Sequence, residues 1–441
     1  MNMRFQFLTL CLLLSPISLR GDDSWPQFRG PQGNGIATGQ TIPAEIGEST
    51  NLAWRTELPG RGWSSPIIAD DIIYVTTAVE RTPNEAERLT MLRDEGIEER
   101  KFKQLAIAKS IDLKLIAIDF NTGSLLRTID LSMISDPDPI HSLNSYSSPT
   151  PTIDGETIYC HFGTYGTYAV DRKSGEAVWA RRLPLEHSVG PGSSPFIYKN
   201  LLVLIQDGVD RQYVTALNKN TGETVWERDR PEMDAPDGDQ KKAYCTPIAI
   251  TDQRGREQLI CMGSQWMVSY KPATGEELWR VKHGKGFSVV PCPVYGDEVV
   301  YFSTGFTKPV LFAVRVDGDG DVSDTHVNWV AKQGIPAKPS PILHDGLIYL
   351  MADNGVASCL NADDGEQVWK KRIGGDYSAS PILAGGHLYF ASQDGKVTVL
   401  EPGREGKIIA ESQIDGRIMA SPAVVKNTLV VRSDQAIYQF K

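Results

Sequence analysis

The chain has 441 residues and a formal net charge of −10, with 41% hydrophobic and 23% charged residues. An acidic, evenly mixed chain lacks the basic surface that attracts nucleic acid or an anionic membrane, so we expect neither partner. The six cysteines form no C-x-x-C pair and no C-x-x-C-H motif, which excludes the usual signatures of zinc and haem sites. We expect a monomer with a large core.

Residues 1–21 are typical of a secretory signal peptide. Arg4 supplies the positive end, Leu8 to Leu14 form an apolar run, and Pro16 to Gly21 form a breaker that ends in a small residue. The apolar run is too short to cross a bilayer, which takes ~20 residues. We therefore predict export to the periplasm or the extracellular space, no transmembrane segment, and an N-terminal extension over residues 22–50.

A proline, usually preceded by serine, opens an apolar and β-branched run at eight places. These prolines are Pro66, Pro149, Pro195, Pro247, Pro293, Pro341, Pro381 and Pro422. Proline is tolerated at the first residue of a strand, where no ladder donor is needed. The runs that follow carry D-D or D-G hairpin turns, as in 67–77 and 342–351, and so predict paired strands.

A second phrase, ending in tryptophan, recurs at a period of roughly 40–50 residues, which is typical of a repeat architecture. Its copies are S-G-E-A-V-W at Trp179, T-G-E-T-V-W at Trp226, T-G-E-E-L-W at Trp279 and D-G-E-Q-V-W at Trp369. Each unit contains four short antiparallel strands, the pattern of a β-propeller blade. We interpret the tryptophan as packing against the next blade and the Thr-Gly pair as a turn.

The two ends of the chain predict how the ring closes. After Pro422 there is room for only three strands, the last at 436–440, whereas N-L-A-W-R-T-E-L at 51–58 stands alone before the first Ser-Pro. We predict that residues 51–441 form one all-β, eight-bladed β-propeller of four-stranded antiparallel blades. The N-terminal strand closes the last blade and so removes the exposed edges.

These A-x-D-x-x-T-G-x-x-x-W repeats with Ser-Pro openings resemble the pyrroloquinoline-quinone (PQQ) repeat of eight-bladed quinoprotein propellers, over about residues 50–441. That family includes PQQ-dependent alcohol dehydrogenases and the non-catalytic BamB subunit of the outer-membrane β-barrel assembly machine. The segment W-P-Q-F-R-G-P-Q-G-N-G at 25–35 resembles the start of secreted PQQ-like propellers common in planctomycete bacteria. The resemblance implies a shared ancestry and packing but not possession of the cofactor.

The longest loops fall where blade topology places them on one face. Residues 80–112 lie between the second and third strands of the first blade, and 132–145, 181–192 and 229–243 each lead into the first strand of a blade. In an up-and-down blade these two kinds of loop lie at the same end of the strands. We expect them to surround the mouth of the channel, because long loops on a rigid scaffold often carry binding residues.

The insertion at 80–112 is strongly charged and has helical spacing at Leu89 and Leu92, with Asn84 as the expected N-cap. It predicts either a lid or partner-docking helix, or a solvated surface excursion.

Aromatic and charged residues precede the strand openings and form a candidate binding rim. The candidate residues are Trp63, Tyr146, His187, Tyr244, Lys338, Tyr377 and Arg417, with His141 in one of the long loops. They predict a ligand or peptide site with aromatic walls and cations, or residues that pack the loops together and hold the strand ends.

The segment D-G-D-G-D-V-S-D at 317–324 is the one metal-like pattern. Asp317, Asp319 and Asp321 alternate as in calcium loops, but Asn328 stands where an EF-hand would have its closing glutamate. The segment is either a structural calcium site, away from the long loops, or an acidic hairpin turn.

Two functional hypotheses follow. The first is a secreted, non-catalytic binding or scaffold propeller that presents its loop-rich face to a protein, peptide or envelope polymer, with no cofactor. The second is a PQQ-dependent oxidoreductase, in which a cation polarises the quinone and an aspartate removes the substrate proton. The absence of the adjacent cysteine pair typical of PQQ alcohol dehydrogenases favours the first, and no catalytic residue can be named from the sequence.

Overall fold

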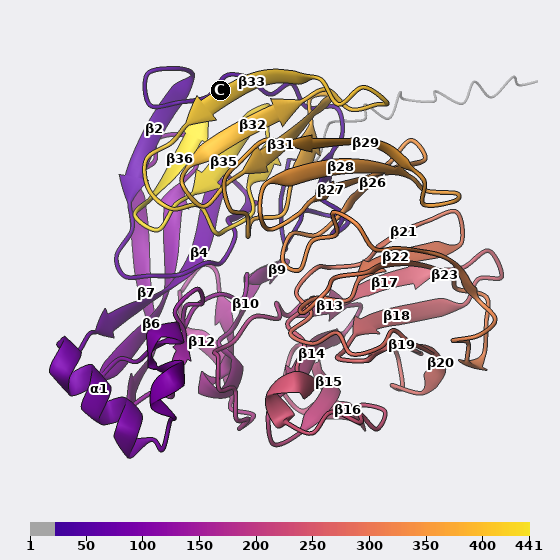
Figure 1. Cartoon of the computed structure of the whole chain (residues 1–441). Helices are drawn as coiled ribbons and strands as arrows, with labels where there is room; N and C mark the ends of the chain where they lie inside the picture. The colour runs from indigo at the N-terminus through magenta and orange to yellow at the C-terminus, as the bar shows by residue number, and fades with distance from the viewer. Residues whose placement is uncertain (1–22) are drawn as a thin grey trace, which may run out of the picture.

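The chain forms eight four-stranded antiparallel sheets arranged as the blades of a propeller, in a computed structural model that describes residues 23–441 (Figure 1). The predicted signal peptide lies outside the described residues. The strands of blades one to four are β3 (Ile67–Ala69), β4 (Ile72–Arg81), β6 (Ser110–Asp119) and β7 (Leu125–Ser135); β9 (Thr152–Asp154), β10 (Thr157–His161), β11 (Thr167–Asp171) and β12 (Ala177–Arg181); β13 (Phe196–Tyr198), β14 (Leu201–Asp207), β15 (Gln212–Asn218) and β16 (Thr224–Asp229); and β17 (Ile248–Thr251), β18 (Glu257–Met262), β19 (Trp266–Tyr270) and β20 (Glu277–Lys282).

Blades five to seven repeat the pattern, and blade eight joins the two ends of the chain. Their strands are β21 (Val294–Gly296), β22 (Val299–Ser303), β23 (Leu311–Arg315) and β25 (Val327–Ala331); β26 (Ile342–His344), β27 (Leu347–Met351), β28 (Val356–Asn361) and β29 (Gln367–Arg372); β30 (Ile382–Ala384), β31 (His387–Ala391), β32 (Lys396–Leu400) and β33 (Ile408–Gln413); and β34 (Ala423–Val425), β35 (Thr428–Arg432), β36 (Ala436–Phe440) and β2 (Leu52–Glu57).

The closure predicted from the sequence is confirmed. Strand β2 pairs antiparallel with β36, from Leu52 opposite Phe440 to Glu57 opposite Ala436, and becomes the outer strand of blade eight. Every blade also begins directly after a proline, as predicted, with one correction. In blade two β9 starts at Thr152, so the opening proline is Pro151 and not Pro149. The doubled S-P-T-P motif explains the misassignment.

The Trp phrase joins neighbouring blades. The Trp179 indole donates to the carbonyl of Lys219 at 2.8 Å, and Trp329 donates to Ala362 at 2.9 Å, in each case one blade further on. The turn glycine of that next blade lies under the ring, because a Cβ on Gly365 (φ +74°) would come within 2.5 Å of Trp329. Trp226 and Trp369 reach the next blade in the same way, and Trp329 stands at the equivalent place of blade five although it lacks the full phrase. Trp279 is the exception, because its indole donates to Gln258 of its own blade. The predicted packing role is thus confirmed for three of the four copies, and the contact explains why the partner turn contains glycine.

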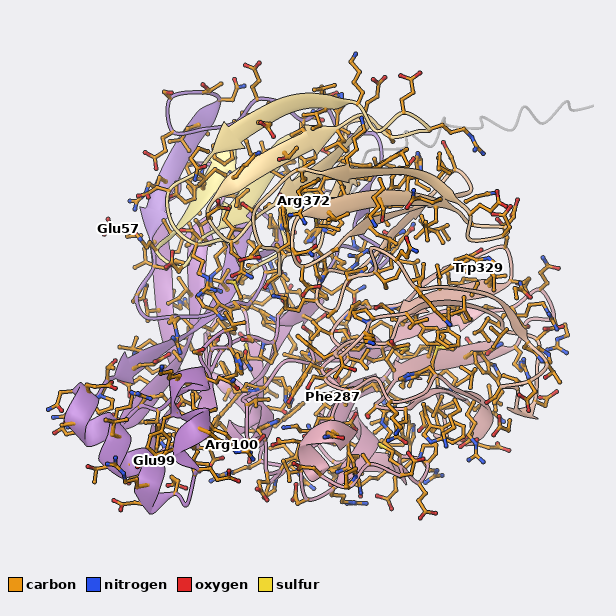
Figure 2. All side chains as sticks on the ribbon, viewed as in Figure 1. Glu57, Glu99, Arg100, Phe287, Trp329 and Arg372 are labelled. Carbon is orange, nitrogen blue, oxygen red and sulfur yellow. The ribbon has the colours of Figure 1, made fainter. Side chains whose placement is uncertain are left out.

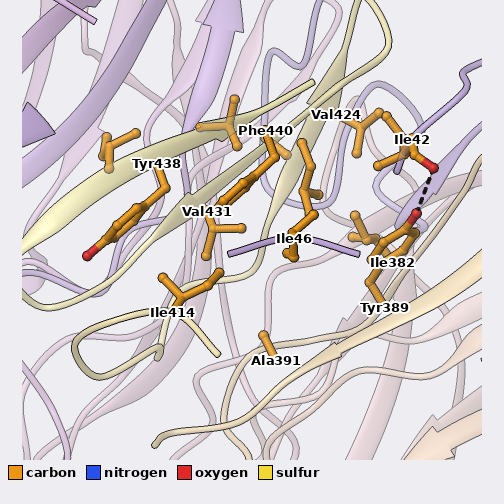
Figure 3. Packing of buried hydrophobic residues seen from close by; sticks show 14 of the residues in the cluster. Ile42, Ile46, Ile382, Tyr389, Ala391, Ile414, Val424, Val431, Tyr438 and Phe440 are labelled. Carbon is orange, nitrogen blue, oxygen red and sulfur yellow. Dashed lines mark hydrogen bonds between the residues drawn. The ribbon is translucent and has the colours of Figure 1, made fainter. Parts of the chain in front are cut away.

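The N-terminal extension crosses the channel. Trp25 exchanges backbone hydrogen bonds with Ile68 of blade one, and Pro26 accepts one from Ile153 of blade two. Arg29 then donates to the carbonyl of Pro341 in blade six, across the ring from blade two, and β1 (Ile36–Ala37) runs parallel to β30 of blade seven. Figure 3 shows the next part of the extension inside the core of blades seven and eight, where Tyr389 donates to the carbonyl of Ile42 at 3.2 Å.

The blade-one insertion carries a capped helix. Strands β4 and β6 extend further than expected, so the connection shortens to residues 82–109 and contains α1 (Glu85–Asp94), η1 (Glu99–Gln104) and β5 (Leu105–Ala106). Asn84 caps α1 as predicted and forms a capping box with Glu87. Leu92, a residue of α1 itself, is fully buried. Strand β5 pairs with β8 (Ile140–His141) of the next long loop. Two further short helices are η2 (Gly163–Tyr165) and η3 (Gly238–Lys241).

Candidate functional site: a hydroxyl-floored funnel

A cavity of about 600 Å³ lies at the loop-rich end of the channel, and all eight blades contribute to its lining. The four long loops predicted to share a face all reach it, through Gln104, His141, Val189 and Asp239 among others. We call this cavity the funnel. Its volume falls within the ~300–1,000 Å³ range of small-molecule and side-chain pockets.

A closed ring of hydrogen bonds forms the floor of the funnel. In each blade the residue before the opening proline donates its backbone N–H to the side chain of the corresponding residue in the next blade. The successive residues are Ser65, Thr150, Ser194, Thr246, Cys292, Ser340, Ser380 and Ser421, with Ser421 donating back to Ser65, and we call them the hydroxyl ring. The Ser-Pro signature thus serves two purposes: proline starts the strand, and the preceding hydroxyl links the blades.

Blade five departs from the ring, because Cys292 replaces the hydroxyl. Its sulfur accepts the backbone N–H of Thr246 and also meets the thiol of Cys245, so two buried free thiols are in contact. Contact with Cys245, assisted by the positive charge of Arg29, lowers the pKa of Cys292, whereas burial raises the pKa of Cys245.

The walls of the funnel are mainly apolar. Trp63, Leu143, Phe287 and Phe306 line them, and Phe28 of the N-terminal extension reaches in from the channel. The Trp63 indole donates to the carbonyl of Leu143 at 3.1 Å, which fixes the ring on the wall. Figure 2 shows Phe287 towards the middle of the molecule, whereas Trp329 lies near its periphery. Leu143 and Phe306 remain 39% and 38% exposed, so they are available to a ligand.

Two lysines and one aspartate supply the charged groups of the lining. The Lys242 ammonium is buried and donates to Asp239 at 2.7 Å and to the carbonyl of His187 at 2.9 Å, and burial lowers its pKa. Lys338 lies 3.4 Å from Asp353 of the neighbouring loop. Partial burial and the nearby charge of Lys338 lower the pKa of His141, which keeps that imidazole neutral at neutral pH.

The structure brings together some of the predicted rim residues and separates others. Trp63, Tyr244, Lys338 and His141 line the funnel. The other four predicted residues, Tyr146, His187, Tyr377 and Arg417, do not line it.

These four residues hold the loops and strand ends instead. Tyr146 is fully buried and donates to the carbonyl of Asp138 at 3.0 Å, and His187 accepts the backbone N–H of Thr164 at 3.0 Å. Tyr377 is fully buried, and Arg417 donates to Gln393 at 2.6 Å.

The three aspartates of the metal-like segment face different partners. Asp319 pairs with Arg256 at 2.9 Å, Asp321 binds Ser323, and Asp317 lies 3.6 Å from Arg315. Part of the segment forms β24 (Gly320–Asp321), which pairs parallel with β20 of blade four. Over residues 23–441 no group of three or more histidine, cysteine, aspartate or glutamate side chains is arranged to hold a metal ion. These residues do not fit a calcium ion.

Sequence reasoning missed the floor and most of the apolar walls. The residue before the opening proline is serine or threonine in seven of the eight blades, and this repetition was the available signal. Phe28, Phe287 and Phe306 carry no signal that separates them from core aromatics, and Lys242 and Asp239 stand in a loop without a repeat.

The amino-acid sequence matches the model of a known protein family over most of its length. The model described as "Outer membrane protein assembly factor BamB" matches residues 43–185, 113–256 and 263–441. The chain belongs to this family. Among curated BamB proteins, that of Burkholderia pseudomallei is 30% identical over 114 residues, which cover 25% of this chain and 29% of the relative. That of Salmonella typhimurium is 31% identical over 94 residues, which cover 19% and 24%. The matched stretches thus span less than a third of either relative.

Solved structures share the fold at low sequence identity. BamB from Moraxella catarrhalis superposes with a TM-score of 0.54 at 18% identity, covering 76% of this chain and 97% of that one. A europium-containing methanol dehydrogenase gives 0.62 at 11% identity, covering 94% and 90%, and a quinohemoprotein alcohol dehydrogenase from Comamonas testosteroni gives 0.62 at 13%, covering 96% and 81%. In residues 23–441 no helix has the length and apolar character needed to cross a membrane.

Proposed function

We propose that this BamB-family propeller is an exported, non-catalytic binding protein that presents the funnel to an apolar group of a protein, peptide or envelope ligand. The observation that carries the proposal is the funnel itself: apolar, partly exposed side chains above a floor to which every blade contributes. A concave apolar site with a few convergent polar groups is the usual form of a binding pocket.

The family name supports an adaptor role. The curated relatives are named assembly factors of outer membrane proteins, which implies contact with other proteins. In this chain residues of all four long loops line the funnel, so a protein partner would meet the loops and the funnel together.

The alternative, a PQQ-dependent dehydrogenase, needs carboxylate ligands for a cation and a free carboxylate base beside the quinone. The funnel lining offers one carboxylate, Asp239, which is already bound by Lys242 and Ser188. Lys338 is likewise beside Asp353. The residues present therefore do not fit PQQ with its cation, and we derive no catalytic step from it. A titration with PQQ and Ca²⁺ tests this, because saturable binding with a quinone absorbance band would favour the alternative.

The binding function can be tested by site-specific photo-crosslinking in intact cells. A photoreactive residue at Leu143, on the funnel wall, is compared with one at Val178, which is 58% exposed on the outer strand of blade two. We expect a discrete adduct from position 143 that disappears when Trp63, Phe287 and Phe306 are all changed to alanine. Equal adducts at the two positions, or no adduct at position 143, would contradict the proposal.

A further inference from the structure

The floor of the funnel carries hydroxyl donors without protein acceptors. Seven ring hydroxyls accept a backbone N–H, and within residues 23–441 six of them donate their own hydrogen to no protein atom: Ser65, Thr150, Ser194, Thr246, Ser340 and Ser421. Ser380 differs, because it donates to Ser340 at 3.0 Å. A hydroxyl has one hydrogen to donate, and buried donors are normally satisfied. A ligand that reaches this floor therefore gains most if it brings acceptor oxygens.

A buried positive charge lies next to the ring, although Arg29 itself does not line the funnel. Arg29 is 1% exposed, forms no salt bridge with a carboxylate among the described residues, and leaves its Nη1 without a hydrogen bond. Its Nη2 donates to the carbonyl of Pro341 at 2.6 Å, directly after ring residue Ser340, and its charge also acts on Cys292. Burial lowers the pKa of Arg29 to about 10, so the guanidinium stays charged at neutral pH. An unpaired buried charge is costly, and a nearby anion offsets that cost.

The two lysines of the lining are each paired with a carboxylate, Lys242 with Asp239 and Lys338 with Asp353, so Arg29 is the positive charge near the floor without such a partner among the described residues. The walls above the floor are aromatic and aliphatic, so the apolar part of a ligand would lie higher than its acceptor group.

We propose that the funnel binds a carboxylate carried on an apolar body, with the carboxylate on the hydroxyl ring and the apolar part against Trp63, Phe287 and Phe306. The inference rests on the proposed binding function and names the chemistry of its ligand. Two sources share this chemistry: an alkanoate, and the free C-terminus of an apolar peptide.

Matched ligand pairs test the carboxylate directly on the full mature protein. Decanoate is compared with decanamide, and acetyl-Leu-Phe with its C-terminal amide, by calorimetry and by tryptophan fluorescence. We expect the acid of at least one pair to bind about ten-fold more tightly than its amide, which corresponds to about 1.4 kcal/mol. The pair with the tighter acid identifies the source. Equal binding of acid and amide in both pairs, or no saturable binding at millimolar concentration, overturns the inference.

Variants separate the charge from the fold. Arg29→Gln is expected to abolish the preference for acid over amide, whereas Arg372→Gln, on an exposed strand position, leaves it unchanged. Ser421→Cys keeps an acceptor for the backbone N–H of the ring, as the sulfur of Cys292 does in blade five, but its thiol is a weaker donor than the hydroxyl. The acid should therefore bind this variant a few-fold less tightly. This measurement remains possible even if Arg29→Gln fails to fold. Retained discrimination in both variants contradicts the assignment. If the photo-crosslinked adduct at position 143 forms but neither acid binds more tightly than its amide, the carboxylate assignment is refuted and the proposed binding function still stands.

Discussion

The backbone N–H of Ser421 donates to the Ser65 hydroxyl at 3.0 Å, although 356 residues separate them in the chain. This bond closes the hydroxyl ring at the channel, while the pairing of β2 with β36 closes the propeller at its outer edge. Blade eight is therefore held to blade one at its innermost residue and completed at its outermost strand. Because the ring is also the floor of the funnel, closure of the fold and shape of the site depend on the same residues.

The closing bond should be measurable as stability. Ser65→Ala removes the acceptor and leaves the buried N–H of Ser421 unpaired, which costs about 1–3 kcal/mol. Urea unfolding should show a lower midpoint, whereas Ser135→Ala, at an exposed position of β7, should stay within about 0.5 kcal/mol of the parent. Equal stabilities for the two variants would show that the ring does not hold the blades together.

The Trp–Gly contact between blades gives a second prediction. Gly365→Ala would place its Cβ 2.5 Å from Trp329 at a φ of +74°, so both strain and overlap oppose it. Gly346→Ala has a similar φ of +70° but open space around the Cβ, and it isolates the backbone strain. We expect Gly365→Ala to be less stable than Gly346→Ala by about 1–3 kcal/mol in thermal or urea unfolding. The contact is unimportant if both variants lose the same amount.

The insertion helix should depend on its cap. Asn84→Ala removes the bond to the Glu87 N–H and opens the capping box, at a cost of about 1 kcal/mol to the helix. Because α1 is a local element, hydrogen exchange over residues 85–94 should accelerate while the blades stay unchanged. Thr90→Ala, which alters an exposed residue in the middle of the helix, serves as the control. Unchanged exchange in Asn84→Ala would contradict the role of the cap.

Local patterns predicted the fold because the blade is built from them. The prolines, the Trp phrase and the lone strand at 51–58 each act within one blade or between neighbours, so their periodicity located the strands and the closure. The hydroxyl ring was harder to foresee. Each of its bonds joins residues in successive blades, as Ser340 joins Ser380, and no spacing within one blade reveals it.

The candidate site was predicted only in part, because the opening proline of blade two was misassigned. Trp63 stands three residues before Pro66 and faces the funnel, whereas Tyr146 stands five residues before Pro151 and turns into the core towards Asp138. The residue three before Pro151 is Ser148, and it lines the funnel. Phe28 and Arg29 belong to an extension without repeats, and their place at the channel follows from a path across the molecule.

Acid should destabilise the protein through its buried imidazoles. Burial lowers the pKa of His161 to about 3 and those of His187 and His283 to about 4, below the unfolded value of 6.5. Between these values the unfolded state binds more protons, so stability is complete above about pH 6.5 and falls as the pH decreases towards 4. Each histidine contributes about 1.4 kcal/mol per pH unit within that window.

The contribution of one histidine can be isolated with His187→Gln, whose amide oxygen can still accept the Thr164 N–H. The variant has no imidazole at this position to protonate, so its unfolding free energy should fall less steeply than that of the parent between pH 6.5 and 5, before most carboxylates titrate. Denaturant unfolding at several pH values measures both slopes. If the unfolding free energies of parent and variant fall in parallel with pH, His187 takes up its proton as readily in the folded protein as in the unfolded chain. The bond from the Thr164 N–H would then not depend on a neutral imidazole.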